Sequence, residues 1–225
     1  MIDKIIDFSK QFNPPPISVF LYGSQATGET NSDSDYEIGF IFNDDDYISR
    51  REIKTKQDFD GVSIYPFRLS ELKNYTLDTP FPKKFFVYQL IKSGKTISGN
   101  DILAQIKIPQ ITKLDLVGAI RFEIGVAFCS FLTMRRNDSL LANNQFSKSC
   151  LNGLRLLIFL KHGELLTTYK DIYSFRKKLN LPDEYQEVVE AAYNFRQRQD
   201  VIKDDLIYKN MSFLNFIENE IMKSK

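Results

Sequence analysis

Cysteine and histidine are scarce in this chain, which has two cysteines and one histidine among its 225 residues. A disulfide framework needs more cysteines and a secreted context. Cys129 and Cys150 lie within apolar helical patterns, so we expect both to be small buried side chains. His162 stands directly before Gly163, and we therefore expect it to end a helix rather than to act as a catalyst.

Long uncharged apolar runs are also missing, because no stretch of about 18 such residues occurs. The N-terminal residues 1–7 are too acidic for a secretory signal. These absences predict a cytoplasmic protein with no membrane contact. The net charge is only +1, and neither half carries the positive excess of a phosphate-backbone binder, so a nucleic-acid partner is not expected. Nothing in the composition indicates an oligomeric state.

The spacing of apolar residues changes near residue 110. Before this point, short apolar runs alternate with turns, and we expect helices over 2–12 and 46–56 and strands over 17–22, 35–42 and 61–67. After it, helical spacing continues over 112–136, 144–162, 168–179, 183–199 and 203–223. The prediction is an α/β (α+β) domain with a mixed sheet over 1–110, followed by an all-α helical bundle over 111–225.

Two polar features flank the turn between the first two expected strands. The first run ends in Gly23, which lets the backbone approach a ligand because it has no side chain. Ser24, expected to cap a short helix running to about residue 29, adds a hydroxyl and free N–H groups that suit an anion. The second run opens with Asp35 and Glu37, whose side chains share a face if both lie in a strand.

Two carboxylates held side by side repel each other unless a cation lies between them. Hard oxygen ligands suit Mg²⁺, which commonly completes its coordination shell with substrate phosphates. The pattern therefore predicts that Asp35 and Glu37 hold Mg²⁺ beside a phosphate bound at Gly23 and Ser24. A Gly-Ser turn and a pair of acids are each common, but their order on neighbouring strands makes the combination specific.

This stretch resembles the nucleotidyltransferase superfamily (the DNA polymerase β-like fold). That family has Gly-Ser after a first strand and an acidic-x-acidic pair opening the next, which here are Gly23-Ser24 and Asp35-Tyr36-Glu37. The resemblance implies a nucleotidyltransferase domain in which Ser24 binds the β,γ-phosphates of a nucleoside triphosphate. It also implies that Asp35 and Glu37 hold Mg²⁺, which polarises the α-phosphorus and stabilises pyrophosphate as the leaving group.

The second half is similar to the C-terminal helical domain of the aminoglycoside (streptomycin/spectinomycin-type) adenylyltransferases. The matching stretches are residues 151–157, 162–164, 169–171 and 181–188. The likeness implies that Arg155 and Lys170 reach the triphosphate across an interdomain cleft. Without the likeness, Arg155 is interpreted as a surface charge and Lys170 as a solvated helix-start residue.

One position departs from the superfamily pattern. Active members usually carry a third carboxylate on the strand after the acidic pair, and the aligned position here is Ser63. A hydroxyl is a weak metal ligand and a poor proton acceptor. Asp60 lies three positions away, on the wrong face of a regular strand. Either the catalytic base comes from elsewhere, or catalysis is weak or absent.

Glu123 is a candidate base, because it is one of few acids in an otherwise apolar helical stretch. Kanamycin-type nucleotidyltransferases are similar in placing a base glutamate on a helix of the C-terminal domain. Burial would raise the pKa of Glu123 toward a value useful for general base catalysis. The alternative is an ion pair between Glu123 and Arg121 or another cation.

The predicted function is transfer of a nucleoside monophosphate, AMP from Mg-ATP, to a hydroxyl of a small-molecule acceptor lying between the domains. The acceptor would be of the aminoglycoside type, although the near-neutral second half gives no support for binding a polycation. Two alternatives remain open. One is a catalytically silent nucleotide-binding or antitoxin-like module, and the other is a protein-modifying AMP transferase.

Overall fold

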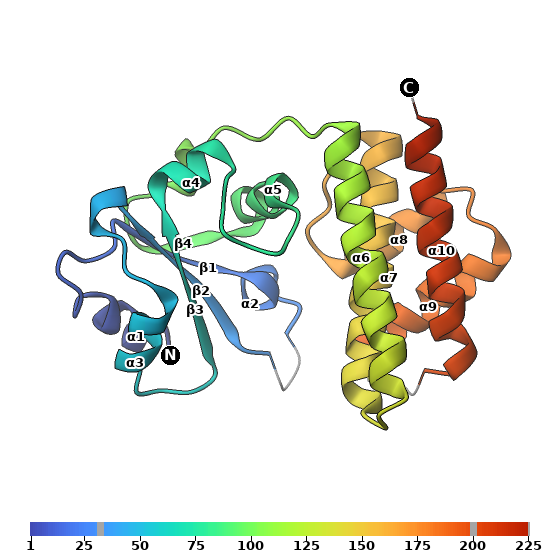
Figure 1. Cartoon of the computed structure of the whole chain (residues 1–225), viewed down its shortest axis with the longest axis horizontal. Coiled ribbons are helices and arrows are strands. Elements are labelled where there is room, and N and C mark those ends of the chain that lie inside the picture. The colour runs from blue at the N-terminus through green and yellow to red at the C-terminus, as the bar shows by residue number, and fades with distance from the viewer. Residues whose placement is uncertain (31–33, 199–201, 225) are drawn as a thin grey trace. The chain divides into compact units, whose positions relative to one another are not determined.

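A computed structural model describes residues 1–30, 34–198 and 202–224. Two compact units divide the chain, Met1–Gln110 and Ile111–Lys225. The elements of each unit are labelled in Figure 1. Residue 199, the expected end of the helix over 183–199, lies outside the described residues.

The first unit is built on a four-stranded sheet in the order β3-β2-β1-β4. The strands are β1 (Ser18–Tyr22), β2 (Tyr36–Phe42), β3 (Val62–Arg68) and β4 (Lys95–Gly99). β1 runs antiparallel to β2 and β4, whereas β2 and β3 are parallel, so the predicted mixed sheet is confirmed. Pro66 lies on the edge strand β3, where its missing N–H costs no ladder hydrogen bond.

Helices pack on both faces of this sheet (Figure 1). They are α1 (Ile2–Ser9), α2 (Gly23–Thr27), α3 (Arg50–Lys56), α4 (Leu69–Asn74) and α5 (Lys83–Ser93). On one face, Phe8 of α1 and Ile53 of α3 join a buried cluster with Phe40 and other strand residues. On the other face, Leu72 of α4 and Val87 of α5 pack with a second set of strand residues. The alternation of side chains along the strands separates the two cores.

The expected helix over 46–56 is wrong in its first half. Asp44–Asp46 form a 3₁₀ turn, and α3 begins only at Arg50. A capping box fixes this start: the Glu52 N–H donates to the Ser49 hydroxyl, and the Ser49 N–H donates to the Glu52 carboxylate. The polar run therefore contains two short elements, of which only α3 has a side-chain N-terminal cap.

The second unit has helices and no strand among its described residues, as predicted. Its helices are α6 (Lys113–Met134), α7 (Ser139–His162), α8 (Tyr169–Phe175), α9 (Asp183–Arg198) and α10 (Asp204–Lys223). α7 packs against each of the other four helices. It begins five residues before the expected start at 144, because the Asp138 carboxylate accepts a hydrogen bond from the Leu141 N–H and caps the helix there.

The expectation that both cysteines are buried is wrong for Cys129. Cys150 is buried in α7, and this burial raises the pKa of its thiol. Cys129 is exposed on α6, on the side that also carries the exposed Phe128 and Leu132. α6 is apolar on most sides, so its sequence pattern does not show which side packs against the bundle.

By length and hydropathy, α6 also qualifies as a helix that could cross a membrane. The core helices of soluble proteins pass the same test. α6 packs on α7 and α10, and it buries the carboxyl group of Glu123 on its packed side. The apolar character of α6 is therefore weak support for a membrane span.

Candidate active site

The turn from β1 into α2 brings Gly23 against a carboxylate. Gly23 has φ of +70°, a left-handed conformation that favours glycine. A Cβ built on Gly23 would overlap the carboxylate of Glu37. Gly23 thus has two reasons to be glycine, its backbone conformation and the close approach of Glu37.

Ser24 is not the helix cap that its sequence position predicts. α2 begins at Gly23, and its N-cap is Tyr22 with no side-chain capping bond, so Ser24 is the second residue of the helix. The helix is only five residues long and ends at Gly28, which has φ of +78°. Ser24 nevertheless remains next to Gly23 and hence near Glu37.

Glu37, Ser63 and Tyr22 form one row across the sheet. Tyr22 pairs with Glu37 across the antiparallel strands, and Glu37 pairs with Ser63 across the parallel strands. Residues in register on adjacent strands share a face. Ser63 therefore occupies the position beside Glu37 where the superfamily pattern places its third carboxylate.

Asp35 lies outside the strand that was expected to begin with it. β2 begins at Tyr36, so Asp35 precedes the strand by one residue, and its side chain is exposed. Glu37 lies within β2, so the pleat of the strand determines the face on which its side chain lies, and this side chain is half-buried. Tyr36 and Ile38 pack with the cluster on the opposite face, as the alternation predicts.

A tyrosine and an arginine near this row could not be predicted from the sequence. Tyr22 is buried, and desolvation together with the charge of Glu37 raises the pKa of its phenol well above the usual range. The guanidinium of Arg50 lies 4.0 Å from the ring centroid of Tyr65, which in turn is 6.2 Å from the ring of Tyr22. The face around Glu37 therefore contains a neutral phenol and a nearby cation.

Only a small set of carboxylates is present for a metal. Among the residues that the structure describes, no group of three or more His, Cys, Asp or Glu side chains could hold an ion. Asp35 and Glu37 alone supply two hard oxygen donors. This number fits Mg²⁺, which often takes one or two protein carboxylates and fills its remaining positions with water and substrate phosphates.

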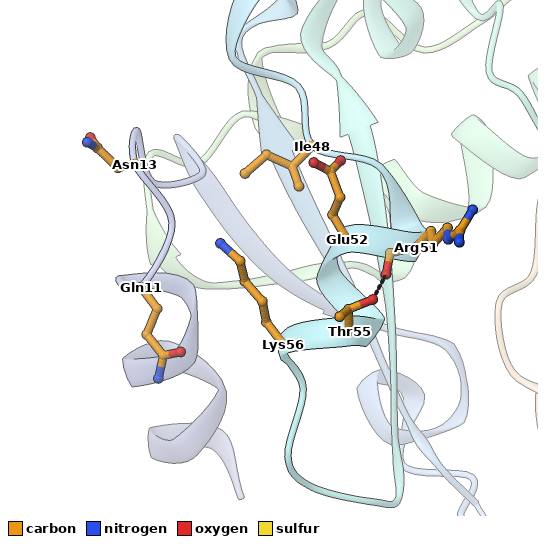
Figure 2. Close-up of a pocket in the computed structure, with 7 residues that line it drawn as sticks. All are labelled: Gln11, Asn13, Ile48, Arg51, Glu52, Thr55 and Lys56. Carbon is orange, nitrogen blue, oxygen red and sulfur yellow. Dashed lines mark hydrogen bonds between the residues drawn. The ribbon is translucent and has the colours of Figure 1, made fainter.

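A pocket elsewhere in the first unit does not contain these residues. It has a volume of about 520 Å³ and is lined by Gln11, Asn13, Ile48, Arg51, Glu52, Thr55 and Lys56. Figure 2 shows four of these side chains on α3, that of Ile48 just before α3, and those of Gln11 and Asn13 after the end of α1. The Arg51 guanidinium points away from the others. The helices α1 and α3 cover the sheet face opposite to Glu37.

In the second unit, Glu123 begins a chain of hydrogen bonds. Its side chain is 8% exposed, and its Oε1 accepts a hydrogen bond from Asn152 at 3.2 Å. The Asn152 carbonyl oxygen accepts one from Arg155 at 2.8 Å. Burial raises the pKa of Glu123 to about 8, although Arg155 and the Asn152 bond act in the opposite direction.

The alternative of an ion pair between Glu123 and Arg121 is wrong, because Arg121 pairs with Glu218 at 2.7 Å. Arg155 is 8% exposed, so it is not a surface charge either. Lys170 is exposed in the first turn of α8, where a solvated helix-start residue would also lie. His162 ends α7 as predicted.

Replacing Gly23 with Ala is expected to destabilise the first unit more than replacing Gly28 with Ala. Both glycines have positive φ, so each substitution costs roughly 1–2 kcal/mol in backbone strain. The methyl group added by Gly23→Ala would also overlap Glu37, whereas nothing lies within 4 Å of a Cβ at Gly28. We expect an additional loss of about 0.5–1.5 kcal/mol for Gly23→Ala, because the carboxylate at the end of the Glu37 side chain must turn aside. Equal urea midpoints for the two variants would contradict the close approach of Glu37.

Residues 3–102 match the protein-family model described as Polymerase beta, Nucleotidyltransferase. Among solved structures, the chain is similar to spectinomycin adenyltransferase AAD(9) from Enterococcus faecialis, which was crystallised with ATP and spectinomycin. The TM-score is 0.64, with 14% sequence identity over 99% of this chain and 98% of that chain. No curated protein sequence matches significantly.

At 14% identity, the likeness to AAD(9) shows the fold alone. Together with the family match, it confirms the predicted resemblance to the nucleotidyltransferases and to the fold of the aminoglycoside adenylyltransferases.

Proposed function

We propose that this chain, whose residues 3–102 match the family model of the polymerase β nucleotidyltransferases, transfers AMP from ATP to a hydroxyl of a small-molecule acceptor. The observation that carries the proposal is the placement of Glu37 beside the Gly23 turn on the sheet of that domain. The similar structure was crystallised with ATP and spectinomycin, which supports a nucleotide donor and an acceptor of that kind.

In this proposal, Asp35 and Glu37 hold Mg²⁺, and the Gly23–Ser24 turn contacts the triphosphate. When bound, the ion would supply positive charge that stabilises the pyrophosphate leaving group. The two carboxylates fit such an ion because they present hard oxygen donors. The exposed position of Asp35 leaves it accessible to a solvated metal–nucleotide complex.

The second unit supplies the other groups of the proposed reaction. Glu123 accepts the proton of the acceptor hydroxyl as its oxygen attacks the α-phosphorus of ATP. A bond forms between that oxygen and the phosphorus, and the bond to the β-phosphate oxygen breaks, so pyrophosphate leaves. Arg155 and Lys170 neutralise charge on the phosphates. Asn152 positions Glu123 through its hydrogen bond.

A second candidate function, the silent nucleotide-binding module, is favoured by Ser63. This residue stands beside Glu37 where a carboxylate would complete the metal site, and its hydroxyl cannot replace that charge. The two candidates differ in one readily measured quantity. A transferase releases pyrophosphate when a suitable acceptor is present, whereas a silent module binds ATP without releasing it.

The deciding experiment measures pyrophosphate release from each nucleoside triphosphate, with Mg²⁺, against a panel of hydroxylated antibiotics that includes spectinomycin. We expect release from ATP only when an acceptor is added. Radiolabel from α-labelled ATP appearing on a protein band would instead indicate the protein-modifying alternative. ATP binding without release against every acceptor and protein would favour the silent module.

A further inference from the structure

One arginine of the first unit reaches the face of the sheet that carries Glu37. Arg50 is the first residue of α3, which packs on the opposite face through Ile53. Its guanidinium carbon nevertheless lies 4.0 Å from the ring centroid of Tyr65 on β3. Tyr65 follows Ser63 by two residues, so both side chains lie on the Glu37 face. Because β3 is an edge strand, a side chain from α3 can reach this face past the edge of the sheet.

The ring of Tyr65 holds this guanidinium in place. The separation is well inside the limit of about 6 Å for a cation–π contact. Tyr65 is itself half-buried and packs against Tyr22, with the ring centroids 6.2 Å apart at an interplanar angle of 64°. A contact with the face of a ring uses the charge and the flat surface of the guanidinium but none of its N–H donors. Arg50 is therefore positioned and still able to donate hydrogen bonds.

The charge of Arg50 acts on the row formed by Tyr22, Glu37 and Ser63. Burial is the main cause of the raised pKa of the Tyr22 phenol, and the negative charge of Glu37 raises this pKa further. The positive charge of Arg50 lowers the same pKa. One phenol thus experiences both charges, so the field of the guanidinium extends across the sheet to this row.

Neither the helix nor an ion pair accounts for a cation at the start of α3. The first turn of a helix favours acidic residues, because the N-terminal end carries partial positive charge, so Arg50 opposes the helix dipole. In the part of the chain that the structure describes, Arg50 forms no ion pair with a carboxylate. Ser63, two residues before the ring that Arg50 contacts, is uncharged. The positive charge on this face is therefore suited to an anionic ligand.

We propose that Arg50 is a further nucleotide-binding residue, whose guanidinium donates hydrogen bonds to the α-phosphate. The Gly23–Ser24 turn follows β1, Glu37 lies on β2, and Arg50 lies over Tyr65 of β3. The order across the sheet is thus turn, carboxylate and guanidinium. A triphosphate whose tail contacts the turn would present its α-phosphate toward Arg50.

An arginine suits this role because its guanidinium can donate two parallel hydrogen bonds to phosphate oxygens. At the α-phosphate, this charge would stabilise the negative charge that develops when an acceptor hydroxyl attacks the phosphorus. The identification of the anion as a nucleotide phosphate rests on the function proposed above. The position of Arg50 depends only on the first unit.

The test measures binding of Mg-ATP and of Mg-pyrophosphate to the full chain by calorimetry. Arg50→Met removes the charge and keeps most of the volume, and we expect Mg-ATP affinity to fall roughly tenfold or more. Affinity for Mg-pyrophosphate, which has no α-phosphate, should fall less than about twofold. Arg51→Met is the matched control, because it removes the same charge from the next residue of α3, which is also exposed. Its Mg-ATP affinity should change less than about twofold.

The outcomes separate this proposal from the transfer reaction. Unchanged Mg-ATP affinity in Arg50→Met, or equal losses in Arg50→Met and Arg51→Met, would overturn the role of Arg50 and leave transfer standing. Equal losses of Mg-ATP and Mg-pyrophosphate affinity would overturn the assignment to the α-phosphate. Mg-ATP binding that depends on Arg50, in a wild type that releases no pyrophosphate with any acceptor, would support the binding residue and overturn transfer.

Arg50→Lys keeps the charge but loses the guanidinium fork, so its Mg-ATP affinity should lie between those of wild type and Arg50→Met. This variant also replaces Arg50→Met if the latter fails to fold. Wild-type Mg-ATP affinity in Arg50→Lys would overturn the role of the fork.

Discussion

Asp35→Asn and Glu37→Gln are each expected to lower acceptor-dependent pyrophosphate release by roughly a hundred- to a thousandfold, because a bound metal stabilises transition-state charge by several kcal/mol. Each substitution keeps the shape of the side chain and removes the negative charge that would hold the ion. The backbone of Glu37 is held more firmly than that of Asp35, because Glu37 lies within β2 and pairs with Tyr22 and Ser63 on the neighbouring strands. The measurement is single-turnover release with saturating ATP and varied Mg²⁺.

Asp45→Asn is the matched control for these variants. Asp45 is an exposed acid in the 3₁₀ turn Asp44–Asp46, so its replacement makes the same chemical change away from the site. Asp44 is less suitable, because its carboxylate accepts a hydrogen bond from the Ser70 N–H. We expect wild-type rates in Asp45→Asn. If the wild type, Asp35→Asn and Glu37→Gln release pyrophosphate equally, the two carboxylates do not hold a catalytic metal.

The sheet and the Gly23–Glu37 relationship could be predicted because their signals are local. A glycine at the end of one apolar run and acids at the start of the next lie within 15 residues, and strand alternation fixes the face of Glu37. The resemblance to the superfamily aligned Ser63 with a third carboxylate, and the register of β2 and β3 pairs Ser63 with Glu37. The start of β2 at Tyr36 was missed by one residue, because polarity alone does not define where ladder hydrogen bonding begins.

The surroundings of these residues could not be predicted, because they depend on contacts distant in sequence. Arg50 stacks on Tyr65 only after α3 packs beside β3. Tyr169 meets Arg155 and Arg196 only after three helices have assembled. No short sequence motif includes residues that lie so far apart in the chain. Cys129 shows the same limit, since an apolar helix does not indicate which of its sides will be buried.

The folding stability of wild type is expected to fall as pH rises from about 4.5 to about 8, with Glu123 contributing roughly 1.4 kcal/mol per pH unit. The pKa of Glu123 is raised to about 8 in the folded protein, so the folded state keeps a proton that the unfolded chain loses above its ordinary carboxyl pKa. The stabilisation is full below the unfolded pKa and is lost as pH approaches the folded pKa. Urea unfolding at several pH values measures it.

Glu123→Gln should flatten this dependence, because the amide resembles the protonated carboxyl and does not ionise. The control is Glu190→Gln on α9, whose side chain is exposed and whose replacement should leave the wild-type profile intact. A Glu123→Gln variant that loses stability with pH as steeply as wild type would show that another group causes the effect.

The same carboxyl group sets the expected pH dependence of transfer. A general base must be deprotonated, so the rate of acceptor-dependent pyrophosphate release should rise with pH and level off above about 8. In Glu123→Gln the rate should fall by roughly 10²–10⁴-fold, and the rise near pH 8 should disappear. ATP affinity should change little, because Glu123 acts on the acceptor.

The Asn152→Ala variant tests whether Glu123 acts as the catalytic base or is only a buried structural acid. It removes the hydrogen bond that orients Glu123 and favours its ionised form, so the rise in rate should move to higher pH while the base remains. A wild-type rate and pH profile in Glu123→Gln would exclude Glu123 as the base. In that case the buried carboxyl has a structural role within the Glu123–Asn152–Arg155 chain, and proton acceptance must be assigned to another group.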